Sequence, residues 1–128
     1  WARLLGRSTA EAELRARLAE VGLEPDADAL VSGFSAGMQK RLSFARVRLE
    51  DARLILLDEP FAALDAAGQE LVSEWIAADR RAGKTVVIAS HNLERAARIA
   101  DRAVLLSRAQ MTWQGIAHAL PAVLARVS

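Results

Sequence analysis

The sequence contains no cysteine, so neither a disulfide framework nor a thiolate metal site can form, which suits a cytosolic protein. No uninterrupted apolar run approaches the roughly 18 residues that a membrane-spanning helix needs. No basic segment followed by an apolar stretch opens the chain, as it would in a secretory signal. We therefore expect that this chain does not itself cross a membrane.

A strong excess of one charge is also missing, because 17 Lys and Arg residues face 16 Asp and Glu residues. A net charge of +1 is no electrostatic footprint for nucleic acid or an anionic bilayer, and we expect no nucleic-acid partner. Lysine is scarce, with only Lys40 and Lys84, and an initiator Met is absent at Trp1. We interpret the chain as a fragment or an excised region.

What is present is an ordinary globular balance, with 52% hydrophobic and 26% charged residues in 128. Apolar periodicity predicts a helix over 1–22, with a break at Gly6, an acidic first turn after Thr9 and a C-cap at Gly22. Turn residues predict a loop over 23–33. A second helix is expected from an N-cap at Ser35 to about Asp51.

The second half alternates between short apolar runs and helical patterns. Leu54–Leu57 predicts a strand buried on both faces, and further segments are expected as helix 67–82 closed by Gly83, strand 85–89, helix 93–100, strand 103–106, strand 111–113, a turn at Gly115 and helix 117–126. Such alternation favours an α/β fold with a parallel sheet. We divide the chain into a helical region, 1–52, and an α/β region, 53–128.

Two carboxylates, Asp58 and Glu59, follow the first predicted strand. Ligand sites of open α/β sheets lie at the carboxyl ends of strands. One carboxylate there can hold Mg²⁺, and the second can align or deprotonate an attacking water. The alternative is that both residues merely start a surface turn before Pro60.

The second candidate feature is a phosphate-binding site at a helix start. Ser35 and Gly37 stand at a predicted helix start, where backbone N–H groups and the positive end of the dipole point outward. An ordinary capped helix is the alternative.

Ser90 and His91 end the next predicted strand, so His91 would lie beside Asp58 and Glu59 if the two strands are neighbours, and could then sense a terminal phosphate. A structural histidine is the alternative there.

Together these segments resemble the ATPases of the ATP-binding cassette (ABC) family. Residues 34–46, FSAGMQKRLSFAR, resemble the signature segment; LILLDEP at 54–60 resembles Walker B; AALD at 62–65 resembles the D-loop; and Ser90-His91 resembles the switch segment. The four stand in the family's order. The resemblance implies a P-loop NTPase-like cassette fold, with a helical signature subdomain over 1–52 and the C-terminal part of a RecA-like core over 53–128.

The resemblance also implies roles. Asp58 would help to hold Mg²⁺, Glu59 would polarise the hydrolytic water, and His91 would contact the γ-phosphate of ATP. Asp65 would lie at the seam between two subunits. The signature segment would contact ATP held by the opposite subunit, through residues Ser35, Ala36, Gly37 and Met38. This segment departs from the common LSGGQ form at Phe34, Ala36 and Met38, and Met38 brings no amide.

A phosphate-binding P-loop is absent. Gly83-Lys84-Thr85 imitates its end, but position 78 is Ala where the motif needs Gly, and a strand rather than a helix follows. We interpret the segment as a helix C-cap and turn. In the family the P-loop precedes the helical subdomain, so we expect this chain alone to be inactive and the intact protein to bind and hydrolyse ATP.

The family implies transport, with a second ABC subunit, membrane permease subunits and a peripheral place on the cytoplasmic face of the membrane. The opening residues 1–6 and the FSAGM form look similar to the ATPase of bacterial haem exporters for cytochrome c maturation. Alternatives are the ATPase of an ABC-2 type drug or polysaccharide exporter, a non-transport ABC protein of DNA repair or ribosomes, and an interaction module. Because part of a cassette is missing, exposed strand edges and apolar surface predict self-association of the isolated chain.

Overall fold

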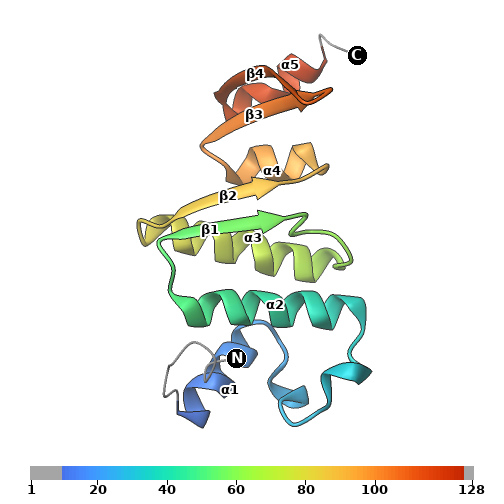
Figure 1. Cartoon of the computed structure of the whole chain (residues 1–128), viewed down its shortest axis with the longest axis vertical. Helices are drawn as coiled ribbons and strands as arrows, with labels where there is room; N and C mark the ends of the chain where they lie inside the picture. The colour runs from blue at the N-terminus through green and yellow to red at the C-terminus, as the bar shows by residue number, and fades with distance from the viewer. Residues whose placement is uncertain (1–9, 126–128) are drawn as a thin grey trace.

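A computed structural model of the chain describes residues 10–125, and its elements form a stack (Figure 1). At one end lie α1 (Glu11–Glu20) and α2 (Ala36–Glu50), with 3-10 turns at Glu24–Asp26 and Val31–Gly33 between them. The middle holds β1 (Leu54–Asp58), α3 (Ala66–Arg81), β2 (Thr85–Ala89) and α4 (Leu93–Ile99). The far end holds β3 (Arg102–Ser107), β4 (Gln110–Ile116), a 3-10 turn at Ala117–Ala119 and α5 (Leu120–Leu124).

Local side-chain chemistry sets the helix ends. The predicted N-cap at Ser35 is confirmed, because its Oγ accepts the backbone N–H of Met38 at 3.2 Å. The predicted end of α1 is also confirmed: Gly22 has φ +67°, and the N–H of Leu23 donates to the carbonyl of Leu18 at 2.8 Å. The predicted Gly6 break and acidic first turn after Thr9 involve positions outside the described residues.

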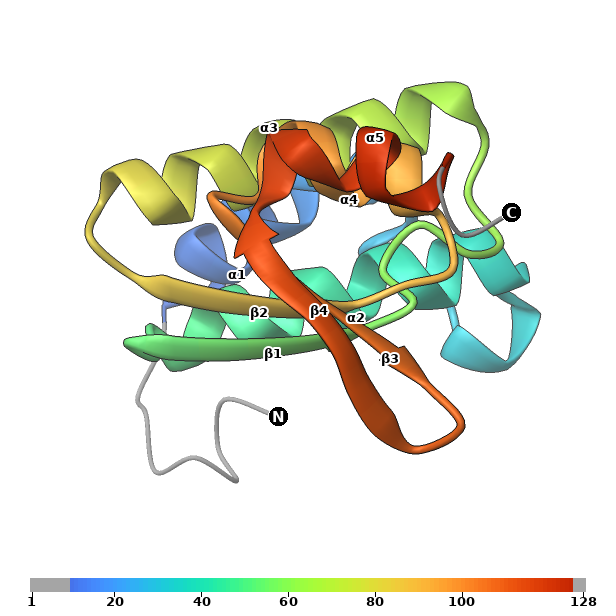
Figure 2. The same cartoon turned by 90° about the horizontal axis from the view of Figure 1, so that it is seen from above.

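The first two predicted strands pair as expected. Strands β1 and β2 are parallel, with Leu54 opposite Thr85 and Asp58 opposite Ala89. Helix α3 joins them as the crossover that a parallel pair needs (Figure 2). The carboxyl ends of the two strands therefore meet at one edge.

The third predicted strand differs from expectation, because β3 pairs antiparallel with β4 in a separate two-stranded sheet. The turn between them lies at Arg108 and Ala109, with φ of 48° and 60°, a geometry that matches the twist of a two-residue hairpin. The predicted turn at Gly115 is wrong. Gly115 lies inside β4, where an added Cβ would come within 2.5 Å of the Trp113 ring.

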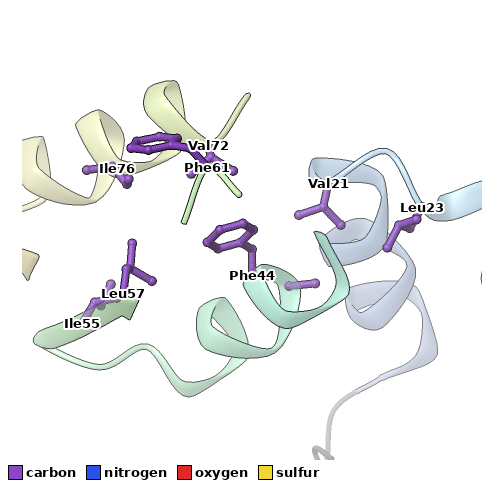
Figure 3. Close-up of a cluster of buried hydrophobic side chains, with 9 residues drawn as sticks. Val21, Leu23, Phe44, Ile55, Leu57, Phe61, Val72 and Ile76 are labelled. Atoms are coloured by element: carbon purple, nitrogen blue, oxygen red, sulfur yellow. The ribbon is translucent and has the colours of Figure 1, made fainter. Parts of the chain in front are cut away.

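The hydrophobic core lies between α1, α2, β1 and α3 (Figure 3). Phe44 on α2 meets Trp75 on α3 edge to face, with ring centroids 5.2 Å apart. The buried cluster comprises Val21, Leu23, Phe44, Ala45, Ile55, Leu57, Phe61, Val72 and Ile76, and Trp75 packs against it. One cluster thus joins the helical region to the α/β region.

The prediction that β1 is buried on both faces is wrong for this chain. Ile55 and Leu57 are buried, but Leu54 and Leu56 on the opposite face are 55% and 69% exposed. Val87 on β2 is likewise 52% exposed. The helices α2 and α3 supply cover for one face of the pair, and within residues 10–125 the other face stays open.

No helix within residues 10–125 is long and apolar enough to cross a membrane.

Candidate functional site

The site begins where β1 ends. Asp58 is the last residue of the strand, and the N–H of Glu59 still donates to the carbonyl of Ala89 on β2 at 2.8 Å. Glu59 has φ +44°, in the left-handed region that costs a non-glycine residue about 1 kcal/mol or more. This conformation turns the chain at the carboxyl end of β1, where the two consecutive carboxylates stand.

The Glu59 carboxylate is held by the loop after β2. Its Oε1 accepts the backbone N–H of His91 at 2.7 Å, and its Oε2 accepts the Ser90 hydroxyl at 3.3 Å. The His91 Nε2 lies 3.6 Å from the same Oε1, while the imidazole is 98% exposed. The predicted meeting of His91 and Glu59 is confirmed. The carboxylate is oriented by two donors, yet its side chain is 32% exposed and within reach of water.

Asp58 offers its carboxylate on the exposed face of β1, while its backbone carbonyl accepts Lys40 Nζ from α2 at 3.1 Å. No group of three or more His, Cys, Asp or Glu side chains within residues 10–125 could hold a metal ion. Mg²⁺ does not need such a cage, because it usually binds one or two carboxylates together with water and phosphate oxygens. A lone Asp58 carboxylate fits that manner of binding.

The start of α2 lies against the turn formed by residues 61–65. Ser35 and Ala36 are exposed, and a Cβ added to Gly37 would lie 3.1 Å from the carbonyl oxygen of Ala63. Met38 supplies the backbone N–H that Ser35 accepts. Because Ser35 Oγ accepts that bond, its own hydrogen remains available for another acceptor such as a phosphate oxygen.

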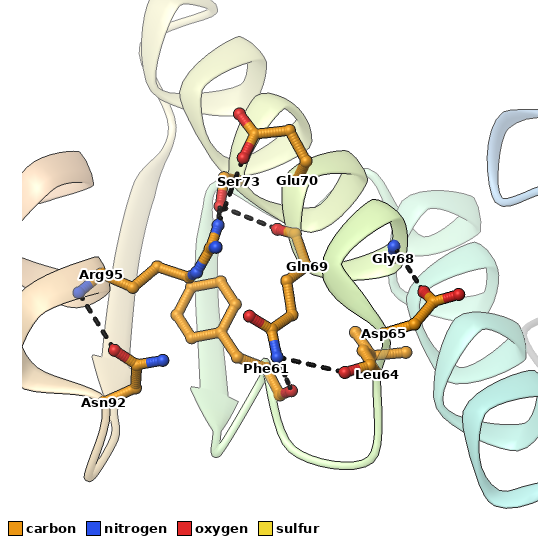
Figure 4. Close-up of polar contacts among 9 residues, drawn as sticks. All are labelled: Phe61, Leu64, Asp65, Gly68, Gln69, Glu70, Ser73, Asn92 and Arg95. Atoms are coloured by element: carbon orange, nitrogen blue, oxygen red, sulfur yellow. Dashed lines mark hydrogen bonds and ion pairs between the residues drawn. The ribbon is translucent and has the colours of Figure 1, made fainter.

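Side chains at the start of α3 hold the 61–65 turn through hydrogen bonds (Figure 4). Asp65 caps the helix, its Oδ1 accepting the N–H of Gly68 at 2.8 Å. Gln69 Nε2 donates to the carbonyls of Leu64 at 3.1 Å and Phe61 at 3.4 Å. The structure therefore gives Asp65 a local capping bond, and its expected place at a seam between subunits stays a prediction.

Sequence reasoning predicted no role in fixing the site for three polar residues of this region. Lys40 reaches the end of β1, Gln69 holds the 61–65 turn, and Ser90 both donates to Glu59 and accepts the backbone N–H of Asn92 at 3.1 Å. Each stands on or beside a segment that the motifs had already marked. Apart from Asn92, two residues from Ser90, their partners lie 5 to 31 residues away in the sequence, which no local pattern reports.

The rejection of Gly83-Lys84-Thr85 as a P-loop is confirmed, because α3 ends there and β2 begins at Thr85. Lys84 Nζ lies 2.9 Å from Asp51 Oδ1 and 3.2 Å from Asp79 Oδ1. The hydrogen bond to Asp51, with a further contribution from Asp79, raises the pKa of Lys84 above its ordinary value. This lysine ties α3 to the end of α2.

The family model described as "ABC transporter" matches residues 3–62. Proteins named "Nod factor export ATP-binding protein I" are similar: that of Rhizobium meliloti (strain 1021) is 36% identical over 86% of this chain and 33% of its own length. That of Mesorhizobium japonicum is 37% identical over 92% of this chain and 35% of its own length. The chain spans about a third of the length of these relatives.

Two solved structures carry the same arrangement of elements. One, an ATP-binding subunit of an ABC transporter, aligns with a TM-score of 0.79 and 25% identity over 96% of this chain and 54% of that one. The other, a metal-chelate type ABC transporter in an inward-facing conformation, aligns with a TM-score of 0.72 and 25% identity over 88% of this chain and 46% of that one. The predicted cassette-type α/β fold is confirmed by these likenesses.

Proposed function

From the premise that this chain has the sequence pattern and the α/β fold of ABC transporter ATP-binding subunits, we propose that its Asp58-Glu59 pair serves Mg-ATP hydrolysis in a transporter. The observation that supports this most is the Glu59 carboxylate, held at the carboxyl edge of β1 and β2 by His91 and Ser90. A carboxylate oriented in this way and open to water is suited to align an attacking water.

In this proposal Asp58 would hold Mg²⁺, and the ion would neutralise charge on the phosphates of ATP. Glu59 orients and deprotonates the hydrolytic water. The exposed imidazole of His91 donates a hydrogen bond to the terminal phosphate. These are roles for this chain's own side chains at one edge of one sheet.

The start of α2 would serve a second nucleotide, outside the Asp58-Glu59 site. The backbone N–H groups of Ala36 and Gly37, in the first turn of α2, and the hydroxyl of Ser35 can bind phosphate oxygens of ATP held by a second ABC subunit. Met38 contributes its backbone N–H to the cap and no side-chain amide. Asp65 would face that same subunit from the adjoining turn.

The 128 residues contain no G-x-x-x-x-G-K-[ST] sequence. We infer that the P-loop belongs to a part of the protein outside these residues, that this chain alone turns over little ATP, and that the whole protein is the active ATPase. The division into a helical subdomain, 1–52, and a core portion, 53–128, belongs to the same proposal. The buried cluster that joins the two parts supports their acting as one body.

The proposed partners are a second ABC ATPase subunit, identical or different, and membrane permease subunits at the cytoplasmic face. For the cargo we favour export related to that of the Nod factor proteins, since the relatives reported above carry that name. Haem export for cytochrome c biogenesis, expected from the opening residues, has no support among those relatives. The cargo itself is a proposal to be tested by transport.

The test is Mg-ATP hydrolysis by the full-length protein as its gene encodes it, compared with Glu59→Gln. We expect hydrolysis to fall about 100-fold or more, because the variant keeps the size of the side chain and removes the base. Glu74→Gln, the same exchange on the exposed side of α3, is the matched control and should keep full activity. Equal activity in wild type and Glu59→Gln would overturn the assignment.

A further inference from the structure

Arg95, on α4, lies between two segments of the candidate site and belongs to neither (Figure 4). Its guanidinium carbon stands 5.7 Å from the centre of the Phe61 ring, at the start of the 61–65 turn. Its Nη1 lies 3.2 Å from Ser73 Oγ and 3.3 Å from Glu70 Oε2, both on α3. The side chain is 26% exposed, so these contacts are partly shielded from water.

The backbone of the same residue is tied to the loop after β2. The N–H of Arg95 donates to Asn92 Oδ1 at 3.1 Å, which caps α4. Asn92 donates its own N–H to Ser90 Oγ at 3.1 Å, and Ser90 donates that hydroxyl to Glu59 Oε2 at 3.3 Å. Through Asn92 and Ser90, the start of α4 that carries Arg95 is therefore connected to the Glu59 carboxylate.

From the side chain of Arg95 a second series reaches the 61–65 turn. Ser73 Oγ donates to the carbonyl of Gln69 at 2.8 Å, and Gln69 Nε2 donates to the carbonyls of Leu64 and Phe61. Asp65 follows directly as the cap of α3. Arg95 thus contacts Phe61 directly and is linked, through Ser73 and Gln69, to the bonds that Gln69 makes with this turn.

We propose that Arg95 is a positioning residue for the ATPase site: it ties the 61–65 turn to the 90–92 loop across the start of α3, so that Asp65, Glu59 and His91 keep one mutual arrangement. The inference rests on the proposed function for its catalytic consequence, and on the contacts alone for the tie itself. Arginine suits this role because a planar guanidinium stacks on a ring and donates hydrogen bonds at the same time.

The tie is tested by hydrogen–deuterium exchange on the full-length protein without nucleotide. Arg95→Ala should speed exchange in both the 61–65 and the 90–92 segments about tenfold, and leave the start of α2 unchanged. The matched control is Arg98→Ala, one turn further along α4, where the arginine is 72% exposed and pairs only with Glu94 among the interactions described. Equal exchange in the two variants would overturn the proposal.

The catalytic consequence is tested by steady-state hydrolysis per folded protein. Arg95→Ala should lower kcat about tenfold and leave the KM for ATP within about twofold, because a displaced base affects the chemical step and not nucleotide binding. Arg95→Lys should restore less than half of the loss, since lysine keeps the charge and loses the stacked, forked geometry. An unchanged kcat with only a lower Tm would mean a merely structural role and overturn the proposal.

The two experiments separate the two proposals. The proposed function fails if the full-length wild type does not hydrolyse ATP, or if Glu59→Gln hydrolyses it equally fast. In either case the exchange rates still decide whether Arg95 ties the two segments. If hydrolysis is present and the Arg95 variants match Arg98→Ala in both experiments, the positioning role fails and the proposed function stands.

Discussion

The two small sheets of this protein have similar apolar strands and opposite surroundings. In the parallel pair, β1 places Ile55 and Leu57 against Phe44 of α2 and Ile76 of α3. In the hairpin, neither β3 (Arg102–Ser107) nor β4 (Gln110–Ile116) has a buried side chain, and Leu106 is 69% exposed. Helices that cover a strand, and not its hydrophobicity, decide how much it contributes to stability. The candidate site lies at the carboxyl edge of the covered pair.

The largest expected difference between the two regions comes from removing a buried ring. Phe44→Ala should lower the free energy of unfolding by about 3–5 kcal/mol, because the cavity would lie where α2, β1 and α3 meet. Val104→Ala on β3, at a position 57% exposed, should cost less than about 0.5 kcal/mol. Urea unfolding followed by circular dichroism checks both. Equal costs would mean that the hairpin is as well packed as the core.

The second effect concerns Lys84, which fastens the parallel pair at its other end. Lys84→Met should cost about 2–3 kcal/mol, because it leaves the Asp79 carboxylate, whose side chain is 5% exposed, with one partner fewer. Hydrogen bonding to Asp51 first, and to Asp79 as well, raises the pKa of Lys84 in the folded state. Its contribution is therefore complete below the ordinary lysine pKa of about 10.4 and is lost as the pH rises through the higher folded value.

Thermal melts of wild type and Lys84→Met between pH 8 and about pH 11.5 check this sign. The difference in Tm should be constant up to about pH 10 and then shrink. A difference that grows with pH would contradict the assignment. Arg81→Met, an exchange on the exposed end of α3, is the control and should show a small difference at every pH.

A third, smaller effect follows from the two caps beside the parallel pair. Ser35→Ala and Asp65→Ala each remove the acceptor of one backbone N–H, and each should cost about 1 kcal/mol. The two losses should be similar, although the proposal gives the residues different places at a second subunit. Urea unfolding measures them, and a loss near zero for Asp65→Ala would show that the 61–65 turn holds its shape without the cap.

The smallest effect on stability is expected on the open faces, where association should change instead. Leu56→Thr together with Leu106→Thr should alter unfolding by less than about 0.5 kcal/mol, since both side chains are 69% exposed. The isolated 128-residue chain should associate through these faces and edges, and the double variant should associate less. Size-exclusion chromatography with light scattering decides, and a monomeric wild-type chain would contradict the expectation.

Much of the site was predictable because its residues stand at the ends of recognisable segments. The strand before Asp58, the cap at Ser35 and the strand before His91 all lie where the pattern predicts them. Parallel pairing of the two strands then brings Glu59 and His91 together. The left-handed conformation of Glu59 and the bond from Ser90 were not predictable, because both depend on how the two loops pack.

The fold was predictable to a similar extent. Most helices and strands agree with the apolar periods, and the parallel crossover follows from their alternation, but the helix expected over 117–126 opens as a 3-10 turn and is α-helical at Leu120–Leu124. Two predictions were wrong: the burial of both faces of β1 and the turn at Gly115. In addition, the third predicted strand pairs in a hairpin and not with the parallel pair. A run of leucines has the same pattern whether one face or two are covered, so the pattern cannot report what lies opposite.

By itself the sequence determined the order of the elements, the residue types at the strand ends and the absence of a P-loop, because periodicity, capping and motif spacing are properties of neighbouring residues. Only the tertiary structure decided that Lys84 pairs with Asp51 and Asp79, that β3 turns away with β4, and that Arg95 lies between the 61–65 turn and the 90–92 loop. These contacts join residues distant in the chain, and their free energy exists only once the helices have packed on the strands.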